Sequence, residues 1–223
     1  MKVIGIQGSP RGRNSFTLKL LESALEGAES AGAETEIIDI TKRKINFCTG
    51  CCHCYKTGEC PQKDDFDKVY EKILDADGII MASPVYFNSV TAQLKAFMDR
   101  TGDCRHCLLL EGKYGMSVVT TASSGGDSTA EFMNDFMNMS GAFTIGCVSV
   151  AMPQIPGNME EACKKSRDMG VDLIDAIKTG RQFPEQKARQ KAFIDVFKYA
   201  VMNFKEEWAS EYEYFVKKGW IKA

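Results

Sequence analysis

Several features are scarce in this sequence, and each scarcity excludes a class of function. The 223 residues include only two histidines, His53 and His106, so a Ser-His-Asp hydrolase triad has almost no candidates for its base. The apolar runs are short, and 78–82 falls far below the ~20 residues that a membrane-spanning helix requires. The net charge is only −2 at pH 7, which argues against nucleic acid or an anionic membrane as a partner.

Targeting and repeat signals are also missing. Residues 1–8 form too short an apolar segment for a signal peptide and lead directly into a glycine turn. We find no internal repeat and no low-complexity segment. Hydrophobic residues make up 44% of the chain and charged residues 26%, values typical of globular proteins. We therefore expect a globular, cytoplasmic protein.

Cysteine, by contrast, is abundant. There are nine, and five lie within the short segment 48–60: Cys48, Cys51, Cys52, Cys54 and Cys60. In a reducing compartment, clustered thiols indicate metal or redox chemistry rather than disulfides. Cys104 and Cys107 form a second, weaker C-x-x-C pattern, for which we expect structural thiols, with a redox pair or metal site as the alternative.

Up to about residue 180, short apolar runs alternate with longer amphipathic stretches, as in βαβ units on a parallel sheet. Ser128 and Asn158, each followed three residues later by glutamate, predict helix N-caps. Five strands with helices on both faces predict a doubly wound α/β domain. We expect strands at 2–7, 34–39, 77–82, 115–121 and 143–150, and helices at 15–31, 64–75, 89–99, 128–140 and 158–179.

The pattern changes in the last forty residues. Apolar and aromatic side chains recur there every three or four residues, which predicts one long helix over 186–217, about 45 Å in length. We expect this stripe to form a contact in a homodimer or homotetramer, because it is wider than one small sheet should cover; the alternative is packing on its own domain. The stripe comprises Phe193, Phe197, Val201, Phe204, Trp208, Tyr212 and Phe215.

Three loops that follow predicted strands have compositions suited to a flat, phosphorylated ligand. Residues 8–17 combine a helix start with hydroxyl groups and Arg11, which favours a phosphate dianion, with an ordinary capped turn as the alternative. Their spacing matches neither a dinucleotide fingerprint nor a P-loop. Residues 83–89 offer aromatic faces and backbone donors to a planar ring such as isoalloxazine. Residues 121–127 supply paired glycines that allow close approach.

The motifs G-S-P-R at 8–11, S-P-V-Y-F-N-S at 83–89 and Q-L-K-A-F-M-D-R-T at 93–101 resemble those of the flavodoxin-like, NAD(P)H-dependent FMN reductase family. The resemblance implies a flavodoxin-like FMN-binding domain at 1–180, with a cysteine-rich loop at 46–61, followed by a C-terminal helical extension at 181–223. It also implies FMN as cofactor and NAD(P)H as a possible electron donor, with no protein side chain required as a catalytic acid.

The resemblance further implies which residues hold FMN. At position 16 the family often carries a small polar residue, so Phe16 weakens one side-chain contact there. By position in the motifs, the phosphate is held by Ser9, Arg11, Ser15, Phe16 and Thr17, the ring by Pro84, Val85, Tyr86, Phe87, Asn88 and Ser89, and the other edge of the ring by Ser123, Ser124 and Gly125.

The spacing Cys48-x2-Cys51-x2-Cys54-x5-Cys60 resembles the compact motif of the iron–sulfur flavoproteins, a branch of this family that holds a [4Fe–4S] cluster beside FMN. Cys52 is then a bystander. The alternatives are a zinc knuckle or free thiols in an FMN-only relative.

The function expected from these features is that of an FMN-dependent oxidoreductase. It would pass electrons between a reduced donor, either NAD(P)H or a ferredoxin-like protein, and an acceptor that is a small molecule or a similar protein. The alternatives are a cluster-free flavin or quinone reductase and a non-enzymatic flavin electron carrier.

Overall fold

A computed structural model describes residues 1–222 of the chain, so that Ala223, the last residue of the predicted extension, lies outside it. Within these residues, five parallel strands form one sheet in the order β2-β1-β3-β4-β5. This is the doubly wound order in which ligands bind beyond the carboxyl ends of the strands. The strands are β1 (Lys2–Gln7), β2 (Glu34–Asp39), β3 (Gly78–Pro84), β4 (Tyr114–Thr121) and β5 (Phe143–Ala151).

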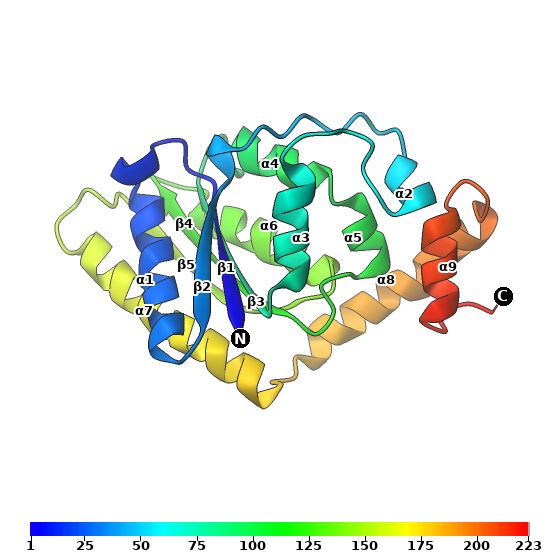
Figure 1. The fold of residues 1–223 in the computed structure, drawn as a ribbon. Coiled ribbons are helices and arrows are strands. Elements are labelled where there is room, and N and C mark those ends of the chain that lie inside the picture. Colours follow the sequence, from blue (N-terminus) through cyan, green and yellow to red (C-terminus); the bar gives the residue numbers. More distant parts are fainter. Residues whose placement is uncertain (223) are drawn as a thin grey trace.

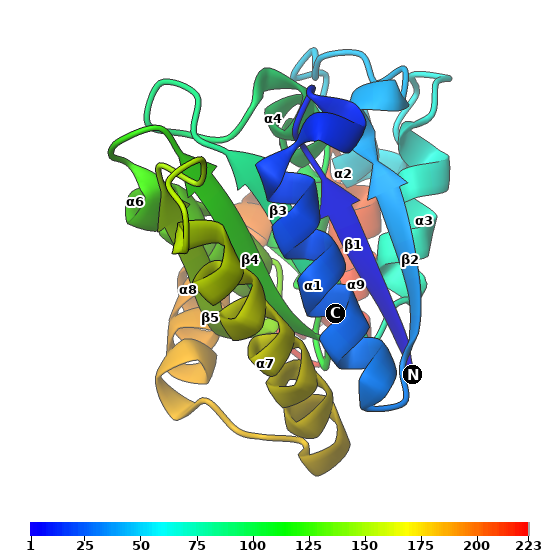
Figure 2. The ribbon, with the colours of Figure 1, turned by 90° about the vertical axis from the view of Figure 1, so that its left-hand side faces the viewer.

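Helices cover both faces of the sheet (Figure 1 and Figure 2). Helices α1 (Phe16–Ser30) and α7 (Asn158–Thr179) pack on one face, and α3 (Phe66–Asp75), α4 (Ala92–Asp99) and α6 (Gly126–Met139) pack on the other. Strand β4 is buried along its whole length, as expected for a parallel strand covered on both sides.

Two glycines allow α1 and α7 to approach closely. A Cβ atom at Gly27 would lie 2.0 Å from the carbonyl oxygen of Arg167, and one at Gly170 would lie 1.9 Å from that of Ala24. Any larger residue at either position would force the two helices apart.

The sequence-based prediction of the α/β architecture is confirmed. Strand boundaries agree within two residues, and the five predicted helices of the domain agree within three. The predicted caps are wrong, because α6 and α7 begin after Gly125 and Gly157, both at positive φ. Asn158 instead donates from Nδ2 to the carbonyl oxygen of Ala151, at 3.1 Å.

Two short helices and two 3-10 turns were not predicted. Helix α2 (His53–Thr57) lies in the cysteine-rich loop, and α5 (Gly102–Cys107) follows α4. The 3-10 turns are η1 (Gly12–Asn14) and η2 (Ile40–Lys42). None of the helices in residues 1–222 is long and apolar enough to span a membrane.

The C-terminal extension is two helices rather than one, α8 (Pro184–Asn203) and α9 (Ala209–Lys217). Most of the aromatic stripe packs within the chain, where Val201 and Phe215 are fully buried against Cys107 and Leu108 of the α5 segment. The stripe is thus covered largely by α5 and by the extension itself rather than by the sheet, which corresponds to the alternative of packing on its own domain. The homodimer or homotetramer stays a prediction, without this stripe as its support.

Candidate functional site

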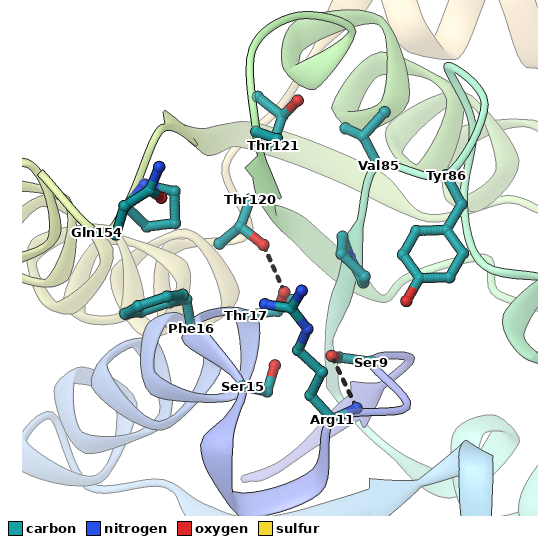
Figure 3. A pocket seen from close by; sticks show the side chains of 13 residues that line it. Ser9, Arg11, Ser15, Phe16, Thr17, Val85, Tyr86, Thr120, Thr121 and Gln154 are labelled. Carbon is teal, nitrogen blue, oxygen red and sulfur yellow. Dashed lines mark hydrogen bonds between the residues drawn. The ribbon is translucent and has the colours of Figure 1, made fainter.

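A cavity of about 430 Å³ opens at the carboxyl edge of the sheet (Figure 3). Its volume is within the usual range of small-molecule sites. Eight of the residues predicted to hold FMN line it: Ser9, Arg11, Ser15, Phe16, Thr17, Pro84, Val85 and Tyr86. Two further lining residues, Thr121 and Ala122, belong to the predicted loop 121–127 but were not among its predicted FMN contacts, and three were missed altogether: Thr120, Pro153 and Gln154.

One end of this cavity is suited to a phosphate group. The side chains of Ser9, Ser15 and Thr17 are buried there, and the hydroxyl of Thr17 lies 2.6 Å from that of Thr120. Ser15 caps α1, whose first turn carries no acidic residue, so its free N–H groups and dipole favour an anion. The side chain of Arg11 points across the opening (Figure 3).

Aromatic and amide groups flank the rest of the cavity. Phe16 and Gln154 lie on one side and Val85 and Tyr86 on the other (Figure 3). A planar ring between them would meet apolar and aromatic surfaces, as a flavin ring requires.

The loop after β3 turns sharply beyond Tyr86. The backbones of Tyr86 and Ser89 exchange two hydrogen bonds of 2.8 and 3.1 Å, and Phe87 and Asn88 between them have φ of 47° and 58°. Left-handed conformations at two such residues store backbone strain, which is typical of functional loops. The side chain of Phe87 is fully exposed, and Phe87, Asn88 and Ser89 do not line the cavity.

The residues near the end of β4 that line the cavity come just before the three that were predicted to contact FMN. Ser123, Ser124 and Gly125 lie outside the lining, while the hydroxyl of Thr121 donates to the carbonyl oxygen of Ser124 at 2.6 Å. Gly125 contacts the previous loop, since a Cβ there would lie 2.8 Å from Oδ1 of Asn88. The loops after β3 and β4, which were predicted to bind the two edges of the ring, therefore contact each other.

The cysteine-rich loop surrounds a second, smaller cavity of about 50 Å³. Within residues 1–222, no three His, Cys, Asp or Glu side chains are close enough together to hold a metal ion. The sulfurs thus share a cavity without converging on one point. Thiols are nevertheless the donor set of iron–sulfur clusters, and by chemistry and number this set fits a [4Fe–4S] cluster. The cavity is lined by Cys48, Cys51, Cys52, Cys54 and Cys60, together with Asp99 and Arg100 of the α4 end.

The thiols of this loop differ in acidity. Hydrogen bonds from the backbone of His53 and the side chain of Thr49 lower the pKa of Cys51, which is exposed. Burial, reinforced by the negative charges of Asp103 and Glu211, raises the pKa of Cys54 to about 12. Cys51 is therefore the readier of the two to act as a thiolate ligand.

Helix α4 connects the two cavities. Its N-cap, Thr91, donates from its hydroxyl to the carbonyl oxygen of Gly8 at 2.7 Å and from its N–H to Oγ of Ser83 at 3.1 Å. It thereby ties together the first two loops of the larger cavity. At the other end, Arg100 lines the cysteine cavity. Eight residues of helix span about 12 Å, so the two cavities lie at opposite ends of one rigid, two-turn element.

The second C-x-x-C pattern is structural. Cys104 and Cys107 are buried and form no disulfide within the described chain, and burial raises the pKa of Cys104 to about 12. His106 between them pairs through Nδ1 with Oε1 of Glu211, at 2.9 Å. A buried neutral thiol is a poor nucleophile and metal ligand, as expected of core cysteines.

Fold and site together define a flavodoxin-like α/β protein with a ligand cavity at its topological switch point. The chain belongs to the NADPH-dependent FMN reductase family, whose model matches residues 1–157. It is an NAD(P)H-dependent, FMN reductase-like oxidoreductase, as the resemblance implied.

Relatives named iron-sulfur flavoprotein are similar along most of the chain. One from Archaeoglobus fulgidus is 37% identical and covers 99% of this chain and 100% of its own length. One from Methanocaldococcus jannaschii is 41% identical over 80% of this chain and 98% of its own. In fold, the chain is similar to an NAD(P)H:quinone oxidoreductase from Methanothermobacter marburgensis, with a TM-score of 0.60 at 18% identity over 78% of this chain and 98% of that one.

Proposed function

We propose that this oxidoreductase uses two redox groups, FMN in the larger cavity and a [4Fe–4S] cluster held by Cys48, Cys51, Cys54 and Cys60. When bound, FMN accepts a hydride and releases single electrons, which an iron–sulfur cluster can carry. The protein would thereby link a two-electron donor such as NAD(P)H to a one-electron partner of the ferredoxin type, or operate in the reverse direction.

The observation that carries this proposal is the placement of five thiols at one end of α4, with the FMN-sized cavity at its other end. The names of the similar archaeal proteins support the cluster. A zinc knuckle would use the same thiols, but zinc has no redox chemistry and would exchange no electrons with a neighbouring flavin.

The roles of the protein's own residues follow from the cavity. The start of α1, with Ser9, Ser15 and Thr17, would bind the phosphate, and the aromatic side of Tyr86 would position the ring. Arg11 is exposed and would add a charge-assisted hydrogen bond to the phosphate. No acid or base is assigned, since hydride transfer to flavin requires position rather than proton transfer from the protein.

Iron analysis with a matched pair of cysteine variants tests the proposal. Anaerobically purified protein should contain about four irons and four acid-labile sulfides per chain. Cys51→Ser should lose them, whereas Cys52→Ser, which changes the adjacent exposed thiol, should keep them. Both variants should retain FMN, because the larger cavity contains neither residue.

Two outcomes would contradict the proposal. Native protein that binds FMN but no iron, even after anaerobic reconstitution, would be a cluster-free FMN reductase. Equal iron loss in Cys51→Ser and Cys52→Ser would show that the four proposed ligands are wrongly chosen.

A further inference from the structure

One buried cation faces the cysteine loop from the end of α4. The side chain of Arg100 is entirely shielded from solvent, as is that of Asp64, with which it forms an ion pair. From Nη2 it donates to Sγ of Cys60 at 3.1 Å and to the carbonyl oxygen of Gln62 at 3.4 Å. The guanidinium also lies 4.3 Å from the centre of the Phe66 ring.

The carboxylate of Asp64 extends these contacts to both ends of the loop. Its Oδ2 accepts from the N–H of Asn46 at 2.8 Å, where the loop begins, and its Oδ1 accepts from that of Phe66 at 3.0 Å, where α3 begins. A guanidinium keeps its proton in proteins, and the carboxylate of Asp64 pairs with it directly. Arg100 is therefore a permanent positive charge inside the base of the loop.

A role in loop closure alone does not account for this arrangement. Burying a charge costs free energy, and an ion pair with one carboxylate would already be enough to hold the two ends of the loop together. Nε of Arg100 has no hydrogen-bond partner within residues 1–222, and Nη2 lies closer to the sulfur of Cys60 than to its second acceptor, the carbonyl oxygen of Gln62. The same side chain lines both the cysteine cavity and an adjoining cavity of about 320 Å³.

We infer that Arg100 is a positioning residue that sets the reduction potential of the cluster through the sulfur of Cys60. This inference rests on the proposed function, since it requires the cluster. A hydrogen bond from a cation withdraws electron density from a ligand sulfur, and the buried charge offsets the electron that reduction adds. Both effects raise the potential of an iron–sulfur cluster.

The test is a redox titration of the cluster, followed by electron paramagnetic resonance, on the FMN-loaded native protein and three variants. Arg100→Gln removes the charge and should lower the potential so that the one-electron equilibrium shifts at least tenfold, which is ~59 mV. Arg100→Lys keeps the charge but loses the planar fork, and should give a smaller shift. Arg105→Gln, at an exposed arginine of α5 that touches none of the loop cysteines, is the matched control and should leave the potential unchanged.

Iron and FMN contents are measured on the same samples. If Arg100→Gln does not fold, Arg100→Lys decides, and a native potential in that variant would overturn the inference. A potential in Arg100→Gln equal to that of Arg105→Gln, with iron retained, would also overturn it. Loss of iron from Arg100→Gln, with a native potential in Arg100→Lys, would leave loop closure as the role. Native protein without iron would instead refute the proposed function itself.

Discussion

Phe215→Ala tests whether the C-terminal helices support the cysteine loop. Phe215 is fully buried in α9, with its ring 4.9 Å from that of Trp220 and 6.3 Å from that of Phe197. At the start of α9, the ring of Trp208 lies 5.3 Å from the ring of Tyr55 in α2. Because α2 carries Cys54 and packs on α9, loosening α9 should loosen the loop.

The expected loss of folding free energy follows from the size of the Phe215 side chain and from the small size of the core around it. Truncating a buried phenylalanine to alanine costs about 3–5 kcal/mol. Only a few side chains are fully buried in the core of the extension, so this loss is large relative to the local stability. We expect α9 and α2 to open without global unfolding, because proteins open in contiguous cooperative units.

Amide hydrogen exchange followed by mass spectrometry measures this directly. Peptides from α2 and α9 should exchange faster in Phe215→Ala, while peptides from β1 and β3 keep the native rate. Tyr199→Ala is the matched control: it removes an aromatic ring from α8 that is 62% exposed, and surface changes of this kind stay within about 0.5 kcal/mol.

Two results would refute the reasoning. If α9 exchanges faster while α2 keeps native protection, the extension does not support the loop. If the strands of the sheet lose protection equally, the extension and the sheet form one cooperative unit.

Two further predictions concern the larger cavity and a buried carboxyl group. Replacing Ser9 and Thr17 together by alanine should weaken FMN binding roughly thirtyfold, since each lost hydrogen bond is worth ~1 kcal/mol; fluorescence titration against Ser128→Ala as control would check this, and an unchanged Kd would remove the phosphate assignment. Burial raises the pKa of Asp103 from 3.8 to about 6, so the folded state holds this proton more tightly and stability should fall as pH rises from about 4 to 6. Asp103→Asn should flatten that fall in urea unfolding, and an equal fall in both proteins would contradict the assignment.

The centre of the sheet was predictable because β1, β3 and β4 are buried on both faces. The run 78–82 in β3 is continuously apolar and leads into Ser83 and Pro84, a pattern that is hard to confuse with a surface segment. The first loop of the larger cavity was also predictable, because it follows β1 directly and its hydroxyl residues come just before and within the start of α1.

The missed lining residues come from the ends of strands rather than from loops rich in glycine. Thr120 lies near the end of β4, and its residue type alone indicates only a strand. Pro153 and Gln154 follow β5, and the rule that ligands bind beyond the carboxyl ends of parallel strands would have indicated them.

The break between α8 and α9 could not be seen in the periodicity. Across it, the N–H of Trp208 bonds to the carbonyl oxygen of Phe204 at 2.8 Å, and that of Tyr212 to that of Trp208 at 2.9 Å. Because this four-residue spacing continues through the turn, the aromatic residues keep helical intervals while the chain changes direction. Only tertiary packing on α5 distinguishes the two arrangements.

The packing of α9 on α2 also determines when, during the life of the chain, the cysteine loop is completed. About 150 residues separate the end of α2 from the start of α9. At 5–20 residues per second, a ribosome needs roughly 8–30 s to synthesise that interval. The thiols thus leave the ribosome long before the helix against which their loop packs. The packing of α2 on α9, and with it the final arrangement of this loop, is therefore completed only after every strand of the sheet has been synthesised.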